Sequence, residues 1–196
     1  MPLPHIQGQR IVVNPGEYFV SAQPVVVSTL LGSCVAACLW DERNNVIGMN
    51  HFLLANRRYM RNESLCCTEA GKYGVHAMEL LINGMMKIGA RRENLRAKVF
   101  GGASVMKTGD GDNFSCVGEV NARFIVEFLK TDGIHLVAAD LGGDVGRVIY
   151  FASEDFSVYV RKMGKDRREE IAQKEEGFWR EATEREVPSA EPDVWL

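Results

Sequence analysis

Two segments with a helical period stand among strand-like segments, and this mixture constrains the fold more than any other feature of the sequence. From Val75 to Ile88, apolar residues recur every three or four positions, as on one face of an amphipathic helix. Gly89 ends this segment, and a second helix is predicted over 117–133. The strand-like segments do not alternate regularly with these helices. The pattern therefore predicts an α+β fold rather than a doubly wound parallel sheet.

Strand candidates combine β-branched and aromatic residues between turn signals. They cover residues 10–13, 17–21, 24–41, 46–55 and 96–106, with two or three more strands between 134 and 162. After Met163 the composition becomes charge-dense. We therefore divide the chain into a core domain, residues 1–162, and a charged C-terminal helix and tail, residues 163–196.

Charge and composition limit the partners and the compartment. The formal net charge is −3 with acidic and basic residues interleaved, so nucleic acid is not an expected partner. The N-terminal "MPLPHIQGQR" lacks the pattern of a signal peptide, and no apolar run reaches the roughly 18 residues of a membrane span. We expect a cytoplasmic protein without direct membrane insertion. An odd number of cysteines, five, then indicates reduced thiols rather than a disulfide framework.

Neither a nucleotide nor a metal site is predicted. The glycine clusters lack both the Walker spacing and a G-x-G-x-x-G between a strand and a helix, so tight turns or a backbone cradle explain them better. A metal site can be assembled on paper, but its residues lack the paired spacing of zinc ligands. These residues are Cys34, Cys38, Cys66, Cys67 and His76. No cofactor is expected.

The stretch "STLLGSCVAACLWD", residues 28–41, points to a cysteine nucleophile. A bend at Gly32-Ser33 can aim backbone N–H groups at a substrate oxygen beside Cys34, whereas Cys38 lies among Ala and Leu as a packing residue. A thiol nucleophile needs a base, and His51 follows in the next strand after a short turn. Such a hairpin can place the two side chains opposite each other. A buried strand with a bulge and a core histidine are the alternatives.

Several segments of the sequence resemble those of a known family. "STLLGSCVAACLWD", "GMNHFLL", "RAKVFGGA", "VGEVN" and "DLGGDVGRVIYF" occur in the order seen in the CheD family of chemoreceptor glutamine deamidases, over residues 11–160. The resemblance implies mixed β-sheets flanked by helices, in a cysteine hydrolase fold related to deamidating bacterial toxins. It also implies a protein-glutamine glutaminase without a cofactor, with Cys34 as nucleophile and His51 as base.

The family's third residue is a Thr six positions before the nucleophile, where this chain has Ser28 with Thr29 beside it. In an extended strand these two side chains point to opposite faces. Ser28 shares its parity with Cys34, so we expect Ser28, through its hydroxyl or its carbonyl, to orient the far nitrogen of His51. Thr29 is the alternative.

The resemblance also implies partners. These are the cytoplasmic helices of methyl-accepting chemotaxis receptors and, in part of the family, a CheC-type phosphatase. Two rival classes stay open at this stage: a non-catalytic module that binds receptors or such a phosphatase, and a zinc-stabilised regulatory domain.

Overall fold

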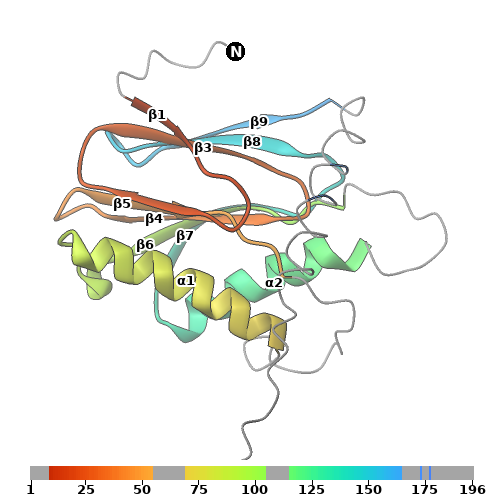
Figure 1. Cartoon of the computed structure of the whole chain (residues 1–196), viewed down its shortest axis with the longest axis horizontal. Coiled ribbons are helices and arrows are strands. Elements are labelled where there is room, and N and C mark those ends of the chain that lie inside the picture. Colours follow the sequence, from red (N-terminus) through yellow and green to blue (C-terminus); the bar gives the residue numbers. More distant parts are fainter. Residues whose placement is uncertain (1–8, 55–68, 105–114, 165–172, 174–176, 178–196) are drawn as a thin grey trace, which may run out of the picture.

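The computed structural model describes residues 9–54, 69–104, 115–164, 173 and 177. Two β-sheets lie face to face, and two helices cover the outer face of the larger sheet (Figure 1). The predicted α+β class with mixed sheets is therefore confirmed. The C-terminal helix and tail expected over 163–196 lie almost entirely outside the described residues.

The smaller sheet has four strands in the order β1 (Gln9–Val12), β3 (Val25–Leu31), β8 (Arg147–Ala152) and β9 (Val158–Lys162). The larger sheet has five, in the order β2 (Tyr18–Ser21), β5 (Val46–Asn50), β4 (Val35–Asp41), β6 (Arg96–Gly101) and β7 (His135–Leu141). Only β1–β3 and β6–β7 pair in parallel among these strands. The helices are α1 (Glu69–Lys87), α2 (Ser115–Thr131) and the short 3-10 turn η2 (Arg92–Asn94).

Helix α1 begins six positions before the predicted start at Val75. The glycines of its first turns look like loop residues in the sequence, but Gly74 is required by packing. A Cβ at Gly74 would lie 2.5 Å from the ring of Phe124 on α2. Among the described residues no helix is long and apolar enough to cross a membrane.

Strand β4 is buried on both faces, which explains its continuous apolar sequence. Its odd-numbered side chains, such as Ala37, pack with the helices, and its even-numbered ones, such as Cys38, pack with the smaller sheet. The alternation follows from the two-residue period of a strand. Cys34 belongs to the set that faces the smaller sheet.

The single predicted segment 24–41 is two strands in different sheets. The chain leaves β3 at Leu31 and enters β4 at Val35, so Gly32–Cys34 carries it from one sheet to the other (Figure 1). The end of β6 closes on this crossing, where the Gly102 N–H donates to the Cys34 carbonyl at 2.7 Å. Gly101 has φ +113°, and a Cβ there would lie 2.1 Å from the same carbonyl. Only glycine fits this position.

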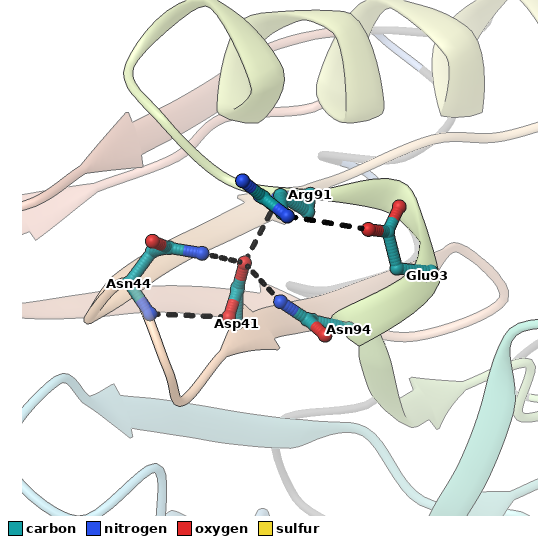
Figure 2. A network of polar contacts seen from close by, with 5 residues as sticks. All are labelled: Asp41, Asn44, Arg91, Glu93 and Asn94. Atoms are coloured by element: carbon teal, nitrogen blue, oxygen red, sulfur yellow. Dashed lines mark hydrogen bonds and ion pairs between the residues drawn. The ribbon is translucent and has the colours of Figure 1, made fainter.

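The other end of β4 is fixed by the carboxylate of Asp41, which lies at the centre of a network of polar contacts (Figure 2) and is fully buried. It accepts hydrogen bonds from the backbone and side chain of Asn44 in the β4–β5 turn, from the Arg91 N–H and from the Asn94 amide. Burial raises the pKa of Asp41, but these hydrogen bonds together outweigh it and hold the pKa below its usual value. The β4–β5 turn sets the register of its hairpin. The network joins this turn to residues 91–94, which follow α1.

We predict that Asp41→Ala lowers the free energy of unfolding by about 2–3 kcal/mol, because several part-buried hydrogen bonds lose their shared acceptor together. Urea denaturation measures this. Asp155→Ala is the control, since Asp155 is exposed and its hydrogen bonds with Ser157 are local. The control should cost less than about 1 kcal/mol. Equal losses in the two variants would contradict the role given to Asp41.

Candidate active site

The β4–β5 hairpin brings Cys34 and His51 to the same face of the larger sheet. Cys38 pairs with Met49 and Val35 pairs with Phe52, so the same register places Ala36 opposite His51. Cys34 lies two positions from Ala36 and is the diagonal neighbour of His51. Diagonal residues are about 7–8 Å apart at their Cα atoms, within reach of an imidazole. The expected hairpin between the two segments is confirmed.

The main chain of His51 is held from the other side by the turn before β2. Its N–H donates to the Glu17 carbonyl at 3.0 Å, and its carbonyl accepts from the Gly16 N–H at 2.8 Å. His51 lies just beyond the end of β5 and is therefore fixed between two neighbouring strands. The backbone of the candidate base is thus set before any side-chain contact is considered.

The imidazole is oriented by Thr29. The Thr29 Oγ1 lies 2.8 Å from His51 Nδ1 and donates its own proton to the Val13 carbonyl at 2.7 Å. A hydroxyl has one proton, so Oγ1 can serve Nδ1 only as an acceptor. The geometry thereby assigns the proton of the neutral ring to Nδ1. The other nitrogen, Nε2, is then an acceptor.

This second nitrogen is buried and has no hydrogen-bond partner within the described part of the chain. Burial lowers the pKa of His51 to about 4, and the Val13 carbonyl opposes this effect more weakly. The ring is therefore neutral at pH 7. A neutral imidazole with an unused lone pair, on the face that carries Cys34, can act as a base toward the thiol.

The preference for Ser28 as the residue that touches His51 is wrong. The Ser28 hydroxyl donates to the Ile11 carbonyl at 3.2 Å and accepts from the Arg10 Nε at 3.2 Å, on the outer face of the smaller sheet. Ser28 would share a face with Cys34 only if one continuous strand ran between them. Because the chain changes sheets in between, parity is not preserved, and Thr29 faces the space between the sheets.

The structure shows where the other candidate cysteines and histidines lie. Cys38 is fully buried, and burial raises the pKa of its thiol, which fits the packing role. His76 and His135 are exposed, so neither lies in the buried space near Cys34. Cys66 and Cys67 lie outside the described residues. Within the described ranges, no group of three His, Cys, Asp or Glu side chains could hold a metal ion.

One residue near Cys34 was not singled out from the sequence. Asn121 on α2 is fully buried and donates from Nδ2 to the Ser33 carbonyl at 2.9 Å. Its only sequence signal is the segment "VGEVN", which carried the family resemblance but no assigned role. A polar residue on the apolar face of a predicted helix is the pattern that could have identified it.

The fold and the site together define the class of protein. It is a two-sheet sandwich covered by helices, with a thiol and a neutral imidazole on the inner face of the larger sheet. The family model described as CheD chemotactic sensory transduction matches residues 53–162. A protein of Geobacter sulfurreducens named probable chemoreceptor glutamine deamidase CheD 1 is 54% identical over 194 residues, covering 97% of this chain and 96% of that protein. The chain belongs to the CheD family.

A second relative supports the same family assignment. The probable chemoreceptor glutamine deamidase CheD 2 of Shewanella oneidensis is 48% identical over 164 residues, covering 83% of this chain and 80% of that protein. A solved structure of a Neisseria meningitidis protein of the DUF152 family is 12% identical, with a TM-score of 0.42 over 69% of this chain and 64% of that one.

We predict that the buried His51 makes stability fall in mild acid. The unfolded chain takes up the proton near pH 6.5 and the folded chain only near pH 4, so the stabilisation is complete above about pH 6.5 and declines below it. At pH 5 the loss is about 2 kcal/mol. Urea denaturation of the wild type and of His51→Gln at pH 7 and pH 5 measures it. An identical change with pH in both proteins would contradict the assignment.

Proposed function

We propose that this chain is a chemoreceptor glutamine deamidase in which Cys34 is the nucleophile and His51 the general base. Family membership and the names of the relatives support the reaction class. One observation carries the assignment of residues. It is the Thr29 contact that holds the His51 proton on Nδ1 and leaves Nε2 as an acceptor on the face of Cys34.

The first half of the reaction forms a thioester. His51 Nε2 takes the Cys34 proton, and the sulfur attacks the carbonyl carbon of a glutamine side chain. Backbone N–H groups around Ser33 and Cys34 hold the oxygen of the tetrahedral intermediate. The protonated imidazole then gives its proton to the leaving nitrogen, and ammonia departs.

The second half uses water. His51 is neutral again, takes a proton from the water molecule, and the resulting hydroxide attacks the thioester carbon. The carbon–sulfur bond breaks, the thiol recovers its proton, and the product is glutamate. The net reaction is one glutamine amide and one water giving one glutamate and one ammonia. No cofactor takes part.

The substrate is the cytoplasmic helical part of a methyl-accepting chemotaxis receptor. Conversion of glutamine to glutamate adds a negative charge and creates a carboxylate that can be methylated, so the reaction regulates receptor signalling in chemotaxis. The proposed substrate implies that the protein acts in the cytoplasm. A CheC-type phosphatase is a further candidate partner on the basis of the family resemblance alone.

The direct test compares two cysteine variants on a receptor cytoplasmic fragment. Cys34→Ala should reduce the deamidation rate by at least about a thousandfold, because the nucleophile is lost. Cys38→Ala is the matched control, a buried thiol on the same face of β4, and should retain activity within about threefold. Mass spectrometry follows the amide-to-acid change of about one dalton.

Retained deamidation by Cys34→Ala, with loss in Cys38→Ala, would overturn the assignment of the nucleophile. A wild-type protein that binds the receptor fragment and leaves every glutamine unchanged would instead favour the non-catalytic binding module.

Thr29 and Ser28 provide a second test, because the Thr29 contact with His51 supports the reverse of the order expected from the sequence. Thr29→Val keeps the shape but removes the acceptor for His51 Nδ1, so kcat should fall by about tenfold, the scale of one hydrogen bond. Thr29→Ser should retain most activity. Ser28→Ala should leave kcat within about twofold of wild type. A selective loss in Ser28→Ala would contradict the geometry.

A further inference from the structure

Asn121 connects the two segments that carry the candidate nucleophile and base. Its Nδ2 donates to the Ser33 carbonyl at 2.9 Å, and its Oδ1 accepts from the Leu54 N–H at 2.8 Å. Ser33 immediately precedes Cys34, and Leu54 lies three residues after His51. The side chain is fully buried, so both bonds form without competition from solvent.

The backbone brings Asn121 close enough to reach this position. Gly118 lies one helical turn earlier on α2, where a Cβ would lie 2.6 Å from the Gly102 carbonyl and 2.7 Å from the Ala103 carbonyl. Gly102 in turn donates to the Cys34 carbonyl. Helix α2 therefore packs directly on the loop that closes over the crossing, and Asn121 extends from it to Ser33.

The bond to the Ser33 carbonyl has a consequence for Cys34. The Ser33 carbonyl and the Cys34 N–H belong to the same peptide plane, and no cis peptide occurs in the described residues. In a trans peptide these two groups point in opposite directions. Asn121 holds the carbonyl toward α2, so the Cys34 N–H is directed away from the helix. Donation to the carbonyl also polarises the peptide and strengthens its N–H as a donor.

We propose that Asn121 is a positioning residue that sets the Ser33–Cys34 peptide so that the Cys34 N–H stabilises the oxyanion of the reaction. The inference rests on the proposed function. It goes beyond it by giving a residue of α2, outside the β-hairpin, a part in transition-state stabilisation. The Cys34 thiol itself does not depend on this peptide orientation for its attack on other electrophiles.

Two reactions of Cys34, alkylation and deamidation, distinguish a positioning role of Asn121 from a merely structural one. Alkylation of Cys34 by iodoacetamide displaces iodide at a saturated carbon, so no charge develops on a carbonyl oxygen. Deamidation passes through an oxyanion. A residue that only keeps the loop folded affects both reactions equally, whereas a residue that aims the N–H affects deamidation alone.

The experiment measures kcat and KM for a receptor fragment, together with the rate of Cys34 alkylation, in Asn121→Ala. We expect kcat to fall at least tenfold, with KM and the alkylation rate within about threefold of wild type. Ser153→Ala is the matched control, because it also removes a buried side-chain bond to a backbone N–H, that of Val25, at the far end of β8. Its kcat should stay within about twofold.

Asn121→Leu decides the question if Asn121→Ala does not fold. The leucine side chain fills the buried site but cannot donate to Ser33, so the same selective loss of kcat is expected. Parallel loss of kcat and alkylation rate, or a wild-type kcat in both variants, would overturn the proposal. Wild type and Cys34→Ala run in the same assay. If these two are equally active, the proposed function fails instead.

Discussion

The structure depends on one close contact, between the end of β6 and the crossing that joins the two sheets. The Gly102 N–H bonds the Cys34 carbonyl at 2.7 Å, and Gly101 leaves no room for a side chain against the same oxygen. This contact fixes where β3 ends and β4 begins. Cys34 consequently stands at the start of a strand, with its neighbours buried on both faces of the sheet.

Around this contact, further backbone hydrogen bonds bring the crossing, the end of β6 and the end of β7 together. The Ala103 N–H bonds the Gly32 carbonyl at 2.7 Å, and the Gly142 N–H bonds the Gly101 carbonyl at 2.8 Å. The crossing, the end of β6 and the end of β7 are thereby joined by backbone bonds alone. Buried backbone groups are satisfied, and the peptide groups near the thiol are rigid. Preorganised dipoles are what stabilisation of a developing charge requires.

Arg147 secures the end of β7 from the smaller sheet. Its guanidinium is almost fully buried, pairs with the Asp140 carboxylate at 2.8 Å and donates to the Asp140 and Gly142 carbonyls. Burial lowers the pKa of Arg147, and the charge of Asp140 opposes this. A buried cation at a sheet junction is costly unless it is paired, and Asp140 supplies that pairing, although the Arg147 Nε has no hydrogen-bond partner among the described residues. Here it joins β8 to the end of β7.

Much of the fold follows from local sequence patterns. The period of α1 and α2, the turn at 42–45 and the strand propensities predict the elements, and the hairpin between Cys34 and His51 follows from a short turn between two apolar strands. The choice between Ser28 and Thr29 could not be made in this way. It depends on which sheet each strand joins, and that is a long-range property. Asn121 was missed for the same reason, because its partners lie 88 and 67 residues away.

The central claim is that Thr29 holds His51 as the neutral tautomer with the proton on Nδ1. Nuclear magnetic resonance of the protein labelled with nitrogen-15 in histidine reads both ring nitrogens directly. At pH 7 we expect a protonated Nδ1 and an unprotonated Nε2 for His51, with the ring titrating near pH 4. A proton on Nε2 at pH 7, or titration near pH 6.5, would contradict it.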